Sequence, residues 1–304
     1  MSETRRGTVY GATAYLMWGL FPLYWPFLAP SPALEVLAHR VAWSLLAVGV
    51  LLALTRRTAG LRKALRQPMQ VLRLAAAAVV IGINWGVFIY GVSSGQVVET
   101  SLGYFINPLV TVMLGVLVLK ERLRPLQWMA MSLAAVAVVI LTVDNGGPPY
   151  IALTLAFTFA VYGLLKKTAG VAPVEGLAIE TAVLAPLAAG YLILLGVQGG
   201  STFGSAGPGH AVLLALSGVI TAVPLLLFGG AAQRVPLTTL GVLQYLAPTI
   251  QFVLGVTLLG ESVGTAELLG FSLVWVALVI FTADLVGHRR RLVRFAAASV
   301  AAAA

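Results

Sequence analysis

The sequence contains no cysteine and very few charged residues. Only 10% of its 304 residues are Asp, Glu, Lys or Arg, whereas soluble domains have about 25%. The missing cysteine excludes disulfides, thiolate metal ligands and cysteine nucleophiles. A soluble fold could not cover its surface with so few charges, and a disordered chain would not be 60% hydrophobic. The composition therefore predicts a polytopic membrane protein.

Motifs of the common enzyme classes are also missing. The sequence has no HExxH, no GxSxG and no Walker-type phosphate loop, and it has only three histidines. We therefore expect a protein that is not an enzyme and that needs no cofactor or metal. The net charge is +9, but no basic segment is interleaved with aromatic residues, so nucleic acid is not an expected partner.

Long apolar runs dominate what is present. Each is close to the roughly 20 residues that a helix needs to cross a bilayer, and Pro, Gly or charged residues separate them. The first run is too long for the core of a cleaved signal peptide. The fold class predicted is an all-α polytopic membrane protein with ten transmembrane helices, at 7–28, 33–54, 71–92, 97–119, 125–143, 149–166, 174–195, 210–229, 236–259 and 265–285.

The basic residues orient these helices. Of the 19 Lys and Arg residues, only Arg40 lies well inside a predicted helix, since Arg73 and Lys166 are at helix ends and are counted with the adjoining loops. With a cytoplasmic N-terminus, the other 18 all fall on the cytoplasmic side, as the positive-inside rule requires. This count includes Lys166 and Lys167, which are assigned to a loop. The predicted location is the bacterial plasma membrane, with both termini cytoplasmic and the lipid bilayer as partner.

An internal repeat divides the chain. Pro108–Asp144 aligns without gaps with Pro248–Asp284 at an offset of 140, with 14 identities in 37 positions. An offset of five helices, an odd number, inserts the two copies in opposite orientations. We expect inverted five-helix repeats at 1–144 and 145–288, followed by a basic and then Ala-rich cytoplasmic tail at 289–304. The end of this tail, from Ala296, is expected to be disordered.

Two ionisable residues inside the predicted helices are candidates for function, because charges in a membrane are costly. Arg40 is interpreted either as a structural or snorkelling residue or as an anchor for an anionic group of a substrate. Glu180, at the equivalent position of the second repeat, is either a proton-coupling carboxylate or a fixed ion-pair partner. Glu35 and Glu99 lie near helix ends, where an interfacial position is expected.

Amide and aromatic residues gather near the middle of the predicted helices. They are interpreted either as interhelical hydrogen-bonding groups or as the lining of a cavity formed by helices one to four and six to nine. Pro108 and Pro248 occupy matching repeat positions, so they are the hinge candidates. With Arg40, the predicted substrate-binding residues are Asn84, Trp85, Tyr104, Asn107, Gln244 and Tyr245.

Several motifs resemble one known family. They are LMWGLFPLYW at 16–25, ExxxHRxxWS at 35–44, NWG at 84–86, SLGYFINPL at 101–109 and LQYLAPT at 243–249. The chain resembles the RarD branch of the EamA drug/metabolite transporters over essentially its whole length. The resemblance implies ten helices as two EamA units in a bacterial plasma membrane, and the export or exchange of small metabolites.

Inverted repeats are typical of carriers that alternate access to a site near the middle of the membrane. The sequence therefore predicts a secondary transporter for a small-molecule substrate, functional as a monomer, which exports a small metabolite or a drug-like amphipathic compound. A channel-like facilitator and a non-transporting receptor or assembly protein remain alternatives.

Overall fold

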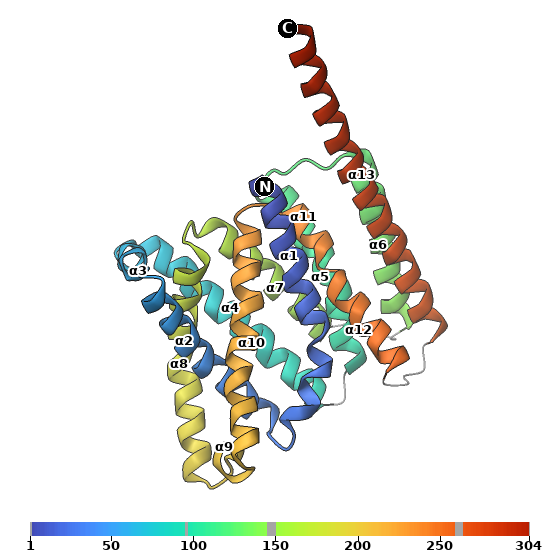
Figure 1. Ribbon diagram of the computed structural model, residues 1–304. Helices are drawn as coiled ribbons and strands as arrows, with labels where there is room; N and C mark the ends of the chain where they lie inside the picture. The colour runs from blue at the N-terminus through green and yellow to red at the C-terminus, as the bar shows by residue number, and fades with distance from the viewer. Residues whose placement is uncertain (1, 95–96, 145–149, 259–263, 304) are drawn as a thin grey trace.

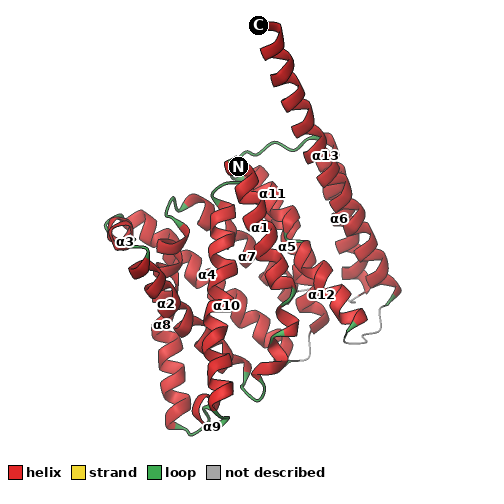
Figure 2. Ribbon diagram, in the orientation of Figure 1, coloured by secondary structure: helices red, strands yellow, loops and turns green. Residues whose placement is uncertain are grey.

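The computed structural model describes residues 2–94, 97–144, 150–258 and 264–303. All regular elements in these residues are helical (Figure 2). The elements are α1 (Glu3–Gly19), η1 (Phe21–Leu23), η2 (Trp25–Leu28), α2 (Ala33–Leu54), α3 (Thr58–Leu65), α4 (Pro68–Ser93), α5 (Val97–Leu117), α6 (Pro125–Asp144), α7 (Tyr150–Thr168), α8 (Pro173–Val197), α9 (Thr202–Ser205), α10 (Pro208–Ala232), α11 (Leu237–Leu243), α12 (Leu246–Thr257) and α13 (Thr265–Ala303).

The described residues contain seven segments that are long and apolar enough to cross a membrane. They correspond to seven of the ten predicted helices, namely α2, α4, α6, α7, α8, α10 and the segment Leu237–Leu254 that runs through α11 into α12. Gly103–Leu117 and Leu268–Asp284 are shorter apolar helices within α5 and α13. The protein is therefore an all-helical, multi-pass membrane protein, while ten helices in an inverted repeat remain a prediction.

The first predicted helix ends earlier than expected. α1 stops at Gly19, and two short 3₁₀ helices carry the chain on to Leu28. Pro22 has no N–H to donate to the carbonyl of Trp18 four residues earlier, so the α-helical ladder cannot continue there. The freed carbonyl accepts a hydrogen bond from Gln251 Nε2 of α12 at 3.2 Å.

The ninth predicted helix is interrupted for the same reason. Pro248 cannot donate to the carbonyl of Gln244, which instead accepts from the N–H of Ala247 at 3.3 Å in a tighter turn. α11 therefore ends at Leu243 and α12 begins at Leu246. Pro108, the repeat equivalent of Pro248, lies inside an uninterrupted α5.

The helices form a central group and a peripheral pair. α1, α2, α4, α5, α7, α8, α10 and α11 pack against one another, whereas α13 packs along α6 at one edge (Figure 1). The central group surrounds a core that includes Tyr162, Phe228 and Leu237. The pair is joined to the centre by a second cluster, in which Phe105 of α5 meets Phe271 of α13 at 4.6 Å between ring centroids.

Glycine allows the closest approach of two central helices. A Cβ atom at Gly218 of α10 would lie 2.3 Å from Cβ of Trp43 and 2.4 Å from its backbone carbonyl carbon. Ser44 Oγ donates a hydrogen bond to the Gly218 carbonyl at 2.9 Å across the same contact. Any larger residue would push α10 away from α2, which carries Arg40.

The structure corrects the expectation that the tail from Ala296 is disordered. α13 continues without a break from Thr265 to Ala303, because alanine has the highest intrinsic helix propensity of all residues. The side chains of the tail arginines and of Glu99, and the loop that contains Glu261, lie outside the residues for which side chains are described.

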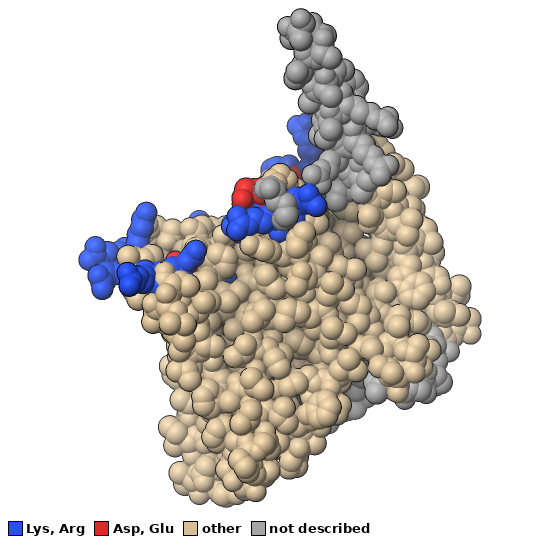
Figure 3. Space-filling model, in the orientation of Figure 1, with Lys and Arg blue, Asp and Glu red and all other residues tan. Residues whose placement is uncertain are grey.

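Lysine and arginine gather at one end of the visible face, near the N-terminus and α3 (Figure 3). α3 is a short helix outside the predicted spans, flanked or occupied by Arg57, Arg62, Lys63 and Arg66. The assignment of Lys166 to a loop was wrong, because its side chain is only 3% exposed. The residue belongs to the last turn of α7.

Candidate functional site

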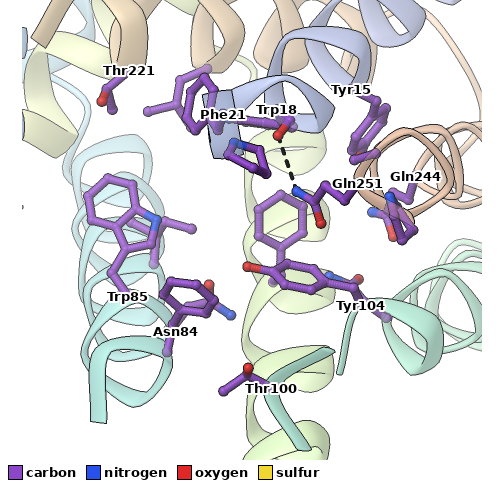
Figure 4. A pocket seen from close by; sticks show the side chains of 18 of the residues that line it. Tyr15, Trp18, Phe21, Asn84, Trp85, Thr100, Tyr104, Thr221, Gln244 and Gln251 are labelled. Atoms are coloured by element: carbon purple, nitrogen blue, oxygen red, sulfur yellow. Dashed lines mark hydrogen bonds between the residues drawn. The ribbon is translucent and has the colours of Figure 1, made fainter. Parts of the chain in front are cut away.

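A cavity of about 290 Å³ lies among the central helices. This volume is close to the lower end of the roughly 300–1,000 Å³ found for small-molecule sites. Its described lining comes from α1, α2, α4, α5, α7, α10 and α12 and from η1 and η2, and Figure 4 shows most of these side chains. α8, which was expected to contribute, supplies none of the lining residues described. The aromatic part of the lining comprises Tyr15, Trp18, Phe21, Trp25, Trp85, Phe88, Tyr104 and Phe159.

Arg40 is the charged residue of this lining. Its Nε donates to Thr221 Oγ1 of α10 at 2.8 Å. The indole rings of Trp25 and Trp85 lie 5.0 and 5.1 Å from its guanidinium carbon, within the range of cation–π contacts. The tight passage of α2 against α10 at Gly218 brings Thr221, one turn further along α10, within reach of Arg40.

Asn84 and Trp85 enter the cavity from α4, opposite Tyr104 and Gln244 (Figure 4). Asn84 Nδ2 donates to the Leu155 carbonyl at 2.9 Å and to Thr158 Oγ1 at 2.8 Å, both on α7. Its amide nitrogen therefore holds α4 against α7, and among the described residues its Oδ1 has no partner. Asn84 thus serves as an interhelical contact and offers an acceptor to the cavity.

Asn107 and Gln244 are joined through Thr111, which is fully buried. Gln244 Nε2 donates to Thr111 Oγ1 at 3.2 Å, and the Thr111 hydroxyl donates onward to Asn107 Oδ1 at 3.1 Å. This chain links α5 to the break between α11 and α12. Because both amides also line the cavity, a movement of the chain at this break would also move the wall of the cavity.

Six of the seven predicted substrate-binding residues line this cavity, namely Arg40, Asn84, Trp85, Tyr104, Asn107 and Gln244. Tyr245 does not. Its ring belongs to the cluster that joins the centre to α6 and α13, and its hydroxyl donates to the Phe105 carbonyl at 3.4 Å. Gln244 faces the cavity, whereas Tyr245, about 100° further round the helix, packs into that cluster. Pro248 lines it, and Pro108 does not.

Sequence reasoning left several lining residues out of its site. Gln251 had a detectable signal, since Pro22 leaves the Trp18 carbonyl in need of a donor. Thr221, Phe159 and Leu225 had none, because they lie in long apolar helices where threonine and phenylalanine are ordinary.

Glu180 lies outside the cavity, in a buried polar group. Its Oε1 accepts from Lys166 Nζ at 2.7 Å, and its Oε2 accepts from Tyr162 Oη at 3.1 Å. The carboxylate therefore has a fixed partner in this conformation. Arg40 and Glu180 occupy equivalent repeat positions and do not touch.

Glu35 lies in the first turn of α2, near the helix end as expected. Its side chain is nevertheless 0% exposed. It accepts hydrogen bonds from Ser201 Oγ at 3.0 Å, Thr202 N at 2.8 Å and Thr202 Oγ1 at 2.9 Å. Glu35 thus ties the start of α2 to α9. In the part of the chain that the structure describes, no group of three metal-ligating side chains occurs.

Comparisons with known proteins find relatives that match almost the whole chain. The model of the EamA-like transporter family matches residues 5–143. "Protein RarD" of Streptomyces exfoliatus is 54% identical over 290 residues, which cover 95% of this chain and 92% of that protein. "Uncharacterized transporter YojE" of Bacillus subtilis is 44% identical over 293 residues, which cover 95% of this chain and 97% of that protein.

The chain belongs to the RarD branch of the EamA-like transporters. This RarD-branch protein is therefore a membrane transporter, and its family is not one of enzymes. A solved crystal structure with 21% sequence identity superposes on it with a TM-score of 0.68, covering 90% of this chain and 96% of the other. At that identity the likeness concerns the fold alone.

Proposed function

We propose that this protein is a secondary transporter that exports a small metabolite or a drug-like amphipathic compound across the bacterial plasma membrane by alternating access. The observation that carries the proposal is the cavity among the central helices, whose described lining has aromatic walls, amide groups and a single charged side chain. A carrier needs such a site where its two halves meet. Arg40, Asn84, Trp85, Tyr104, Asn107 and Gln244 are the substrate-binding residues of the proposal.

The packing supports an inverted repeat of ten helices. Under the offset of 140 residues, α1, α2, α4, α5 and α6 correspond to α7, α8, α10, α11–α12 and α13. The contact of α1 with α10 then has a counterpart in α7 with α4, and α2 with α10 has one in α8 with α4. α2 packs on α8, α5 on α11 and α6 on α13, each on its own counterpart. The family model, which matches residues 5–143, fits a first repeat of 1–144.

With cytoplasmic termini, we interpret the structure as an outward-facing state. The cavity residues Arg40, Tyr104 and Asn107 come from the outer halves of α2 and α5. The cytoplasmic halves are closed by buried side chains, with the rings of Tyr162 and Phe228 stacked at 5.6 Å. Opening toward the cytoplasm would have to separate this layer.

The two prolines and Glu180 have roles in that change. The break before Pro248 needs only a small rotation to tilt α12 against α11, and Pro108 provides the corresponding weak point in α5. Glu180 lies in the closed cytoplasmic layer with Lys166. Protonation of Glu180 would release the pair when the layer opens, so this carboxylate is the coupling candidate.

Counterflow in proteoliposomes tests the proposal. Vesicles preloaded with an unlabelled compound should accumulate the labelled compound transiently, over a panel of amino acids, small aromatic metabolites and chloramphenicol. Flux without counterflow would instead indicate a channel-like facilitator. Absence of flux and of ligand-induced thermal stabilisation, in protein shown to be folded, would favour a receptor or assembly protein. The Arg66→Gln variant, altered at an exposed position, is the matched control for Arg40 variants.

A further inference from the structure

We propose that the cavity selects small organic monoanions, with a carboxylate or similar head group on a flat apolar body. The inference rests on the proposed transport function and specifies the substrate class of the same site. It follows from three features of the cavity, which are an uncompensated cation, the exposed edge of that cation and the chemistry of the surrounding wall.

The cation is Arg40. In the chain as far as it is described, no carboxylate lies within 4.0 Å of its guanidinium, and the cavity lining contains no Asp or Glu. Lys166 shows the contrast, because this buried cation has Glu180 at 2.7 Å. An unpaired charge in an apolar environment is costly. A ligand with one negative charge would supply the counterion that the protein omits.

The contacts of Arg40 leave a specific edge available. Thr221 takes the Nε hydrogen, and the rings of Trp25 and Trp85 contact the guanidinium. Neither terminal nitrogen of Arg40 has a hydrogen-bond partner among the described residues. Those two nitrogens form the planar fork that binds both oxygens of a carboxylate. The Thr221 contact and the two indoles would hold the fork in place before a ligand arrives.

The wall defines the rest of the ligand. Eight aromatic side chains surround about 290 Å³, which suits a small planar body. Among the lining residues that the structure describes, a second negative charge would find no second cation. A cationic ligand would find no carboxylate among them and would be repelled by Arg40. The anion with a single charge is therefore the preferred ligand over the neutral, zwitterionic and cationic forms of the same body.

A series with a constant body and a variable charge tests this inference. Indole-3-acetate, indole-3-ethanol, tryptophan and tryptamine are added to the purified full-length protein at neutral pH, and the thermal unfolding midpoint is followed against concentration. We expect indole-3-acetate to stabilise the protein at the lowest concentration. Arg40→Gln should weaken that binding by about tenfold to hundredfold, since hydrogen bonds to charged groups contribute about 1.5–3 kcal/mol. Arg66→Gln should bind as the unaltered protein does.

Arg40→Lys keeps the positive charge but lacks the planar fork. It is a second variant that tests the inference if Arg40→Gln does not fold. It should lie between Arg40→Gln and the unaltered protein. Equal or tighter binding of tryptamine, tryptophan or indole-3-ethanol would overturn the inference, as would binding of none of the four. Counterflow of a compound of another class would then leave the transport function intact. Binding of indole-3-acetate without any counterflow would support the ligand class and contradict transport by alternating access.

Discussion

Lys166 Nζ lies 2.7 Å from Glu180 Oε1, and both side chains are only 3% exposed. The two residues come from neighbouring membrane helices, α7 and α8. Tyr162 completes the group by donating to the second carboxylate oxygen at 3.1 Å. The two opposite charges are thus buried together, away from lipid and water, and each stabilises the other.

Removing one charge of this pair should destabilise the fold. Glu180→Gln leaves the Lys166 ammonium buried without a counterion, and such a loss costs about 3–5 kcal/mol in buried pairs. We expect a large drop in the thermal unfolding midpoint in detergent. The double variant Glu180→Gln with Lys166→Met should recover most of it. Glu3→Gln, which breaks an exposed pair with Arg234, is the control and should change little.

Proton coupling through Glu180 predicts that one variant will give opposite results in two transport assays. The same double variant cannot bind or release a proton at position 180, yet its cavity is unaltered. It should keep counterflow, which needs no driving ion, and lose accumulation driven by a pH gradient. Retained gradient-driven accumulation would show that Glu180 is a structural partner of Lys166 only.

The contact of α10 with α2 gives a stability prediction with an internal control. Gly218→Ala places a methyl group 2.3 Å from Cβ of Trp43, a distance that requires the helices to separate. Overpacking of this kind costs about 1–3 kcal/mol. Gly49→Ala on α2 meets nothing within 4 Å and should be neutral or slightly stabilising. Equal unfolding midpoints for the two variants would contradict the close packing described for Gly218.

The sequence anticipated the helices better than the directions of their side chains. Pro and Gly mark most helix ends, and Pro22 and Pro248 also carry the physical reason for the two breaks. What sequence alone could not resolve is the facing of neighbours such as Gln244 and Tyr245, since both are polar and lie in one helical segment. Lys166 was missed because a basic residue at a helix end normally reaches the interface. Only the fold shows that Glu180 is close enough to hold it.

The hydrogen bond that Gln251 donates to the Trp18 carbonyl should matter less for stability when a backbone N–H can donate to the same carbonyl. Gln251→Leu removes the donor to that part-buried carbonyl, which should cost no more than the roughly 1–3 kcal/mol of a fully buried unsatisfied group. In a Pro22→Ala background, residue 22 regains an N–H four residues after Trp18 and α1 can extend. The penalty of Gln251→Leu should therefore be smaller in that background. Identical penalties in the two backgrounds, measured by thermal unfolding as a double-mutant cycle, would contradict this account of the break.

The absence of cysteine makes the proposed orientation directly testable. Arg66→Cys lies just after α3 and Gly204→Cys within α9, at exposed positions near opposite ends of the helix bundle. In intact cells, a membrane-impermeant maleimide should label Gly204→Cys, whereas Arg66→Cys should react only after the membrane is broken. Tyr104→Cys lies in the cavity proposed to face outward, so it should be labelled from outside and protected by a bound substrate. Labelling of Arg66→Cys in intact cells would invert the orientation, and it would make the cavity open to the cytoplasm instead.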